Sequence, residues 1–499
     1  MEDKLDSFIR KYPCIFLFGT GKMALPLKRH IEDCGVNVRG MVVSIKKDEV
    51  FDGTPIFTPD EIKCAPENCG IVLALSAKYH EEVSRILADN GFRHIFKCDD
   101  EHLKKYLEEF NTFSLASVQS YPGFIPMKQE APSSWGYVLI IRLDGIGDNV
   151  MMTPFLRELR RNHPESHIML LTTEASYNLF EVCPYTDEVI PVNVADFMQG
   201  YLETRLEKIK GFMEALLQGR IVDVAMVPRW DIDAYGASFL AFFSGARYSV
   251  AYSEKVLETK CEANKNYDLL FSHVIEDCSR RHEVERNLDF LRAVGCIVKN
   301  DTLELWDNKE DKRTVDNLLS GLMPLEGIKL IAVGLSAGLE RKKWETKRYL
   351  EFVLKASAEY DDLFFVLLGG NDANSIAAEI VRGFSGANMV NLVEKLTLRQ
   401  SFSLLKQAFM YVGNDTGIMH IAAAAGIRIL EISSFPKDDY LYDCTTYRFR
   451  PWGVPCYIAQ PETGRDDCRG LCQMPYAHCI NDVSVDEVYN GFKELLGGG

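Results

Sequence analysis

The sequence predicts an α/β protein in which a small unit precedes two larger Rossmann-like domains that face each other across a cleft. Short apolar runs alternate with amphipathic, helix-like stretches along most of the chain, and such alternation is typical of parallel βαβ units. The alternation falls into three blocks, and the last two are similar in size. A stretch rich in Ser, Pro and Gly separates the first block from the second, which is typical of a linker.

The length and charge of the chain agree with this division. The 499 residues correspond to roughly three domains of about 150 residues each. Lys and Arg number 56 against 72 Asp and Glu, a net charge of −16, which argues against a general nucleic-acid binder because such proteins carry a basic surface. No apolar run approaches the roughly 18–20 residues that span a bilayer, and the acidic N-terminus shows no signal peptide. We expect a cytoplasmic protein without a transmembrane segment, and leave peripheral membrane contact open.

The first predicted domain covers residues 1–110, and the predicted linker covers 111–135. Apolar runs at 12–19, 36–43 and 71–75 are the expected strands. The turn Gly19-Thr20-Gly21-Lys22-Met23-Ala24 fits a Rossmann turn but is not a phosphate-binding P-loop, because Met23 stands where that motif needs Ser or Thr. The unit is similar to the small nucleotide-binding-like domain of some sugar acyltransferases. A structural or interaction role is the alternative.

The second predicted domain covers residues 136–310 and begins with the apolar run 137–141. The third covers 325–499 and begins with the strand-like run 329–334. Its last segment, 484–496, is a predicted helix with Ser484 as the N-cap and Glu487 at the capping-box position. Ligands of such α/β domains bind at the carboxyl ends of the strands, so the loops that follow the predicted strands are the candidate sites.

The first such loop contains a Gly-x-Gly turn between a strand and a helix. It reads Arg142-Leu-Asp-Gly-Ile-Gly-Asp148, and the glycines allow a tight turn and a close approach to a ligand. Asp148 is expected at the start of the helix, facing the cleft. It is either a functional carboxylate or only the cap of the helix, because Asp is a favoured N-cap residue.

The second loop, Asn414-Asp-Thr-Gly-Ile-Met-His420, again joins a strand to a helix. A helix N-terminus offers unpaired N–H groups and a positive dipole end, which suit a phosphate, and Thr416 adds a hydroxyl. His420 lies one turn inside the helix, where it either serves the site or only packs.

Two more loops follow strands of the third domain. The basic loop 336–344 contains Lys342 and Lys343 and is suited to neutralise a diphosphate, although a solvated run of charges is the alternative. Gly369-Gly370-Asn371-Asp372 places an acid where it can accept hydrogen bonds from a ribose, or where it is simply a turn residue.

Together these motifs resemble glycosyltransferase family 9, the ADP-heptose heptosyltransferases of bacterial surface polysaccharides such as lipopolysaccharide, over residues 136–496. The resemblance implies a GT-B fold and an inverting transfer that needs no cofactor, with a nucleotide sugar as donor and a glycan or protein as acceptor. It implies that Asp148 is the general base. The implied substrate-binding residues are Lys342, Thr416 and Gly417 at the diphosphate, Asp372 at the nucleoside, and Gly147, Asp415 and His420 around the two turns. His420 either supports the turn 415–417 or touches the donor.

Asp144 departs from the family pattern, in which small or hydroxyl residues are common before the Gly-Asp pair. A second carboxylate there is expected either to raise the pKa of Asp148 by like-charge repulsion or to bind the acceptor. This departure and the added N-terminal domain also motivate a rival hypothesis, a non-catalytic nucleotide-sugar-binding or scaffold protein with a degenerate transferase core.

The chain has 14 cysteines, and most are expected to be reduced thiols in a cytoplasmic protein. Four of them, Cys456, Cys468, Cys472 and Cys479, cluster near the C-terminus. Four thiolates are able to hold a structural Zn or Fe, and some protein-modifying relatives that this sequence resembles carry an iron-binding four-cysteine set. Free thiols and a disulfide are the alternatives.

Overall fold

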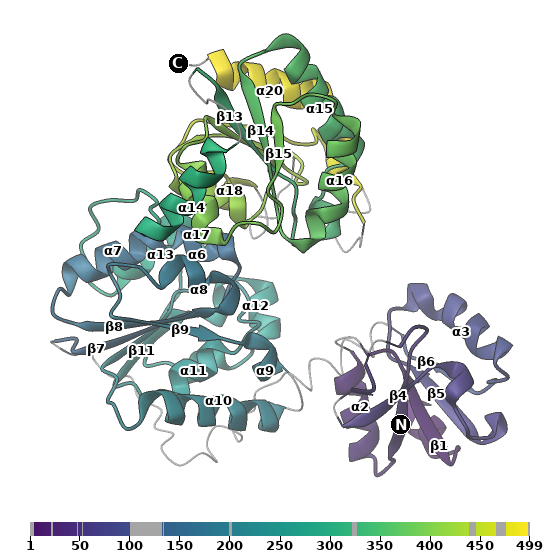
Figure 1. The fold of residues 1–499 in the computed structure, drawn as a ribbon. Helices are drawn as coiled ribbons and strands as arrows, with labels where there is room; N and C mark the ends of the chain where they lie inside the picture. Colours follow the sequence, from purple (N-terminus) through teal and green to yellow (C-terminus); the bar gives the residue numbers. More distant parts are fainter. Residues whose placement is uncertain are drawn as a thin grey trace.

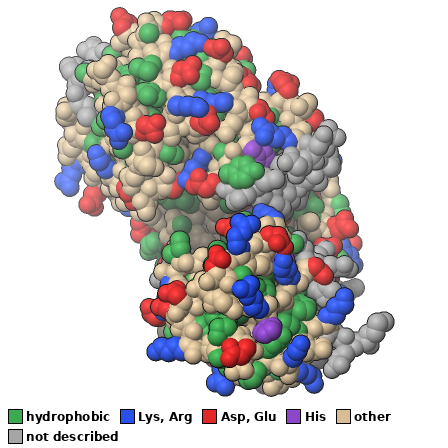
Figure 2. All heavy atoms as spheres, turned by 90° about the vertical axis from the view of Figure 1, so that its right-hand side faces the viewer, with side chains coloured by type: hydrophobic (Ala, Val, Ile, Leu, Met, Phe, Trp, Pro, Cys, Tyr) green, Lys and Arg blue, Asp and Glu red, His purple; other side chains and the backbone are tan. Residues whose placement is uncertain are grey.

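The computed structural model describes residues 4–20, 23–46, 48–51, 53–99, 132, 134–198, 202–321, 327–438, 446–465 and 476–497. It contains three six-stranded sheets, one in each of the three predicted blocks (Figure 1). The boundaries of the predicted domains stay a prediction, because almost the whole predicted linker lies outside the described residues. On the face that Figure 2 shows, basic side chains are interspersed with acidic ones.

The N-terminal sheet has the order β3-β4-β2-β1-β5-β6 and is parallel except for the β3–β4 pair. Its strands are β1 (Cys14–Phe18), β2 (Val38–Val42), β3 (Val50–Phe51), β4 (Thr54–Phe57), β5 (Cys69–Leu73) and β6 (Ile95–Lys97). Its helices are α1 (Lys4–Ile9), α2 (Ala24–Asp33) and α3 (His80–Asp89). Two hydrophobic clusters fill this unit: one packs Leu5 and Leu27 of α1 and α2 against the sheet, and the other packs Leu87 of α3.

The second and third sheets share one topology. The second consists of β7 (Tyr137–Arg142), β8 (His167–Thr173), β9 (Glu188–Val192), β10 (Val224–Val227), β11 (Tyr248–Tyr252) and β12 (His273–Ile275). The third consists of β13 (Lys329–Gly334), β14 (Leu363–Leu368), β15 (Met389–Asn391), β16 (Met410–Asn414), β17 (Arg428–Ile432) and β18 (Cys456–Ala459). Counted along the chain, each has the strand order 3-2-1-4-5-6, which is the doubly wound order of dinucleotide-binding domains. The two predicted Rossmann-like sheets are confirmed.

Helices cover both faces of these sheets. Those of the second unit are α6 (Ile146–Met151), α7 (Thr153–Asn162), α8 (Glu174–Phe180), α9 (Val194–Met198), α10 (Leu202–Leu217), α11 (Ala237–Phe243), α12 (Glu258–Ala263) and α13 (Glu283–Ala293). The next helix, α14 (Lys309–Ser320), packs against the third unit. Those of the third are α15 (Thr346–Glu359), α16 (Asn374–Gly383), α17 (Leu398–Leu405), α18 (Gly417–Ala424), α19 (Thr446–Phe449) and α20 (Val485–Gly497). Among the described residues, no helix combines the length and the apolar character that a membrane crossing requires.

The second and third units are joined by packing as well as by the chain. One hydrophobic cluster contains Ile140 of β7 and Ala332 of β13, and so extends through both units. Arg399 of α17 forms ion pairs with Asp311 of α14 and, at 2.5 Å, with Glu181 beyond α8. Helices α6 and α18 also lie against each other, which brings the loops after β7 and β16 together.

The chain crosses back to the second unit after β17. In residues 446–454 the Arg448 guanidinium reaches Glu283 of α13, and the Trp452 indole N–H donates to the Asp301 carbonyl at 3.0 Å. The chain then returns to the third sheet as β18 and ends in α20. This excursion places a cation from the C-terminal part of the chain inside the second unit.

The predicted start of α20 is half confirmed. The Ser484 hydroxyl accepts the Glu487 N–H at 3.1 Å, as expected for an N-cap. The predicted capping box is wrong, because the Glu487 carboxylate accepts instead from the Gln460 N–H, at 3.3 Å.

Candidate functional site

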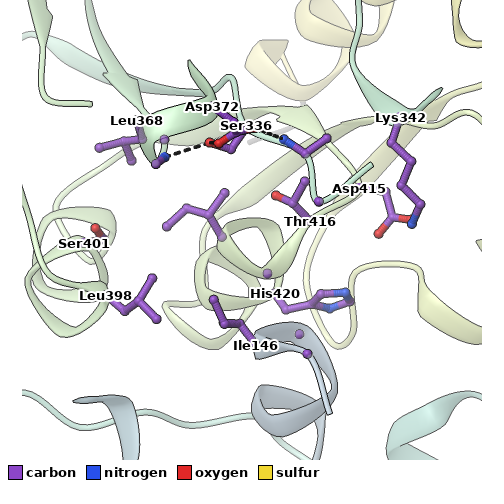
Figure 3. Close-up of a pocket in the computed structure, with 18 of the residues that line it drawn as sticks. Ile146, Ser336, Lys342, Leu368, Asp372, Leu398, Ser401, Asp415, Thr416 and His420 are labelled. Atoms are coloured by element: carbon purple, nitrogen blue, oxygen red, sulfur yellow. Dashed lines mark hydrogen bonds and ion pairs between the residues drawn. The ribbon is translucent and has the colours of Figure 1, made fainter. Parts of the chain in front are cut away.

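A cavity of about 860 Å³ lies between the second and third units, at the carboxyl ends of β7, β13 and β16. These strands lie where the strand order reverses in each sheet, which is where doubly wound domains bind ligands. Figure 3 shows the third unit's side chains over the cavity and Ile146 reaching it from α6. Predicted site residues that line it are Gly147, Asp148, Lys342, Asp372, Asp415, Thr416, Gly417 and His420.

Asp148 is the carboxylate that the second unit contributes to the cavity wall. The N-cap of α6 is Gly145, so Asp148 is not the cap of the helix, and that alternative is wrong. Its side chain is 30% exposed, and its Oδ1 lies 3.7 Å from the Arg142 guanidinium. Desolvation raises the pKa of Asp148 to about 6; Arg142 opposes this shift, and the carboxylates of Glu283 and Asp231 add to it. A base with such a pKa is ionised at neutral pH and still accepts a proton readily.

Asp148 borders a buried network of charges that the sequence did not reveal. Glu283, which is fully buried, accepts from Arg142 at 2.8 Å and from Arg448 at 2.8 Å. Although burial opposes it, the attraction of Arg448 and Arg142 holds the pKa of Glu283 well below its usual range. Arg448 also pairs with Asp231 at 3.1 Å. The Arg142 Nη2 that lies near Asp148 is therefore held in place by the Glu283 carboxylate, which it contacts at 2.8 Å.

Asp144 does not have either of the roles predicted for it. It is 4% exposed, does not line the cavity, and forms ion pairs with Arg142, at 2.5 Å, and with Arg229. Its charge is compensated by two guanidinium groups, and the carboxylates that chiefly raise the pKa of Asp148 are Glu283 and Asp231. The structure thus corrects the expectation that Asp144 raises that pKa or binds the acceptor: it is a buried counter-ion in the same network.

Lys342 enters the cavity from the loop after β13. The loop forms a short 3-10 helix, Glu340–Lys342, and the Lys342 ammonium lies 2.7 Å from Asp415 Oδ2. Asp415 is 8% exposed, so it holds the cation at the edge of the cavity (Figure 3). Lys343 points elsewhere: it pairs with Glu340 at 2.5 Å and Asp372 at 3.3 Å. The two neighbouring lysines thus serve different carboxylates.

Asp372 follows β14 and faces the loop after β13. Its Oδ1 accepts from the Ser336 hydroxyl at 2.7 Å and its Oδ2 from the Ala337 N–H at 3.1 Å. These hydrogen bonds and Lys343 outweigh desolvation and lower the pKa of Asp372. The carboxylate therefore stays ionised, orders the loop, and is still 38% exposed at the cavity.

Helix α18 begins at the cavity with Gly417, and Thr416 is its N-cap. The first N–H groups of a helix have no partner within the helix, so they are available to an anion there. His420, 3% exposed, lies in the first turn. Burial lowers its pKa to about 4, so the imidazole is neutral at neutral pH. Its Nδ1 has no hydrogen-bond partner within the described part of the chain.

The two helices approach through glycine on each side. A Cβ on Gly147 would lie 2.5 Å from His420 Cδ2, and a Cβ on Gly417 would lie 2.7 Å from Ile146 Cβ. Any side chain at either position would push α6 and α18 apart. His420 therefore packs across the boundary between the units, directly beside the residue that precedes Asp148.

We expect Gly147→Ala to lower the free energy of unfolding by about 1–3 kcal/mol, the usual cost of overpacking, and to reduce kcat because α6 carries Asp148. Thermal denaturation and initial rates measure the two effects. Gly211→Ala in α10 is the matched control, because nothing lies within 4 Å of a Cβ there. Adding His420→Ala should restore part of the stability. Equal stability and activity of the Gly147 and Gly211 variants would contradict the close contact.

Two of the four cysteines predicted to bind a metal lie in the described part of the chain. Cys456 begins β18 and is exposed, and Cys479 is buried in the 3-10 helix Cys479–Asp482. Cys468 and Cys472 lie outside the described residues. A metal on the four cysteines stays a prediction.

Sequence and structure comparisons place the chain near one family. The model of glycosyltransferase family 9 (heptosyltransferase) matches residues 240–432. Lipopolysaccharide heptosyltransferase 3 of Escherichia coli is 22% identical over 319 residues, 61% of this chain and 83% of that protein. A family 9 glycosyl transferase from Veillonella parvula superposes with a TM-score of 0.59, at 16% identity, over 73% of this chain and 98% of that one. E. coli ADP-heptose lipopolysaccharide heptosyltransferase II superposes with a TM-score of 0.54, at 19% identity, over 72% of this chain and 98% of that one. The predicted GT-B architecture is confirmed by these likenesses.

Proposed function

We propose that this chain, a glycosyltransferase of the family 9 type, transfers heptose from ADP-heptose, with inversion, to a surface glycan or a protein. The observation that carries the proposal is the convergence on one cavity of a base of raised pKa, a lysine and a helix N-terminus. The proposed base comes from one unit and the two proposed anion-binding groups come from the other, so an acceptor and a donor are able to bind on opposite walls of the cavity.

In the proposed reaction, Asp148 removes the proton from an acceptor hydroxyl while the oxygen attacks the anomeric carbon of the donor. The bond from that carbon to the diphosphate oxygen breaks on the opposite face, and the nucleoside diphosphate leaves with the electron pair. The proton ends on Asp148, so the charge balances. The steps as proposed use no metal ion or other cofactor.

The leaving group is to be stabilised by the third unit. Lys342, held by Asp415 at 2.7 Å, and the free N–H groups at Gly417 are placed to bind the diphosphate as its charge grows, and interactions that strengthen in the transition state raise kcat. The apolar wall of the cavity includes Leu368, Leu392 and Leu396. A nucleoside base fits such a wall, with the exposed edge of Asp372 available to a ribose hydroxyl.

The acceptor must lie against the second unit, because Asp148 is there. Gly145, Met151 and Asn178 are uncharged residues that the second unit contributes to the cavity wall. A sugar hydroxyl at the end of a glycan is able to reach Asp148 across it. Because the similar E. coli protein is named a lipopolysaccharide heptosyltransferase, we propose a surface glycan as the acceptor. A protein acceptor is the second option.

A thermal-shift panel with ADP, UDP, GDP and ADP-heptose tests the donor. At 100 times its Kd a ligand stabilises the folded protein by about 2.7 kcal/mol, and we expect that shift for ADP and ADP-heptose alone. Mass spectrometry of a glycan acceptor incubated with ADP-heptose tests the transfer. An increase in melting temperature with UDP or GDP but not with ADP would overturn the proposed assignment of ADP-heptose as the donor. Binding without transfer to either acceptor class would favour the scaffold hypothesis.

A further inference from the structure

Three side chains with metal-binding atoms meet in the N-terminal unit, away from the cavity. Asp6 belongs to α1, and His30 and Cys34 lie four residues apart at the end of α2. Because residues four apart share one face of a helix, the imidazole and the thiol point the same way, toward Asp6. The set is noteworthy because it combines oxygen, nitrogen and sulfur donors.

Of the three separations between these atoms, one falls within the range for ligands of a tetrahedral ion, one is shorter and one is slightly longer. Asp6 Oδ1 lies 2.9 Å from His30 Nε2 and 3.5 Å from Cys34 Sγ, and Cys34 Sγ lies 3.9 Å from His30 Nε2. A tetrahedral Zn²⁺ with bonds of about 2.0–2.3 Å holds its ligand atoms about 3.3–3.8 Å apart. Small movements of the side chains, without a change in the backbone, therefore make the three atoms ligands of one ion.

We propose that Asp6, His30 and Cys34 form a binding site for a divalent transition-metal ion of the zinc type. A carboxylate, a thiolate and a neutral imidazole carry two negative charges, which balance the ion. Thiolate and imidazole ligands favour Zn²⁺ over Mg²⁺ or Ca²⁺. The Asp6 and His30 side chains are 22% and 23% exposed, so a water molecule is able to fill the fourth position.

In the metal-free protein the Cys34 thiol donates a hydrogen bond to the Asp6 carboxylate. A bound ion would replace the proton between these two groups, so that the sulfur and the carboxylate oxygen both become its ligands. A simple Asp6–His30 ion pair would not need a sulfur atom within hydrogen-bonding distance of the same carboxylate oxygen.

Such a site would fasten α1 to the unit. The helix has only six residues, and helices of that length are marginal alone, so α1 depends on Leu5 and Ile9 in the hydrophobic cluster. An ion bound by Asp6 and by α2 adds a second attachment. Metal binding in such places becomes local folding free energy.

The test uses the full chain, stripped with a chelator, equilibrated with Zn²⁺ and desalted before elemental analysis. Wild type should carry about one zinc ion per chain more than Cys34→Ser. Cys261→Ser, which removes an exposed cysteine of α12, should match wild type. Any metal on the C-terminal cysteines contributes equally to all three proteins and cancels in the comparison.

Titration with Co²⁺ gives a second reading, because a thiolate ligand produces a charge-transfer absorption band. The band should be more intense in wild type than in Cys34→Ser, and the difference is the contribution of Cys34, because any band from the C-terminal cysteines is the same in both proteins. In His30→Gln, which keeps the thiol, this contribution should weaken. If Cys34→Ser fails to fold, the zinc content and the band of His30→Gln decide. Zinc content equal to that of wild type in both variants would overturn the site.

Discussion

Asp148→Asn should lower kcat by about 10²–10⁴-fold, the usual contribution of a general base, while donor binding changes little. Asparagine keeps the size of the side chain and its place on α6 but cannot accept the acceptor's proton. The structure supports this expectation because Asp148 is the carboxylate of the second unit that lines the cavity, with a pKa raised to about 6. Single-turnover rates with saturating donor measure the effect on chemistry directly.

The pH dependence identifies the group. The base works when ionised, so the wild-type rate should fall about tenfold per pH unit below about pH 6, and the variant should lack this acid limb. A raised pKa means that folding favours the protonated form. Protonated Asp148 therefore stabilises the folded protein below pH 3.8, the usual pKa of Asp, and this contribution is lost as the pH rises through about 6. At neutral pH Asp148→Asn should therefore melt no lower than wild type.

The exposed residue Asp361 provides the matched control, because Asp361→Asn removes one carboxylate far from the cavity and should leave rate and pH profile unchanged. A fully active Asp148→Asn, or an acid limb that persists in it, would show that another group is the base.

Lys342→Met should reduce kcat/KM for the donor by about 10²–10³-fold, the range measured when one preorganised stabilising group is removed. Methionine keeps most of the length of the unbranched side chain and removes its charge. Donor affinity and kcat should both fall, because the negative charge on the diphosphate increases as the sugar bond breaks. Calorimetric titration with ADP and initial rates over donor concentration separate the two effects.

Two further lysines control this experiment. Lys347 is exposed and pairs only loosely, at 3.4 Å, with Glu345, so Lys347→Met should behave as wild type. Lys343→Met should act mainly on donor KM, because Lys343 pairs with Asp372. A change confined to the acceptor KM in Lys342→Met would remove Lys342 from the donor side.

Loss of Lys342 also leaves the buried Asp415 carboxylate without its cation. Adding Asp415→Asn to Lys342→Met removes this unpaired charge. The double variant should regain thermal stability without regaining activity, which separates folding from catalysis.

The sequence was informative where function depends on neighbouring residues. The Gly-x-Gly-Asp and Asp-Thr-Gly motifs each contain a strand end, a turn and a helix start, so Asp148 and Thr416 could be placed within their loops before any tertiary contact was known. The apolar runs at 137–141 and 329–334 also predicted the strands that begin the second and third sheets. The fold class followed from how these local units alternate.

Prediction failed where charges far apart in sequence meet. Glu283 lies in a run of charged residues that looks solvated, and Arg448 follows a stretch without clear periodicity, yet both are buried against each other. Asp144 was misread for the same reason: its partner Arg229 lies on a different strand end. Of the residues in this network, only Arg142 could have been suspected from the sequence, because it is a cation at the end of an otherwise apolar strand.

The hydrophobic cluster shared by the second and third units couples the unfolding of the two units. Ile140 and Ala332 belong to the same packed core although they lie in different sheets, so the two units should melt in one calorimetric transition, whereas the N-terminal unit, with clusters of its own, is free to melt separately. A cavity-forming substitution deep in the second sheet would then weaken nucleotide affinity at a distance. The effect of a core substitution in either the second or the third unit accordingly depends on the stability of both units.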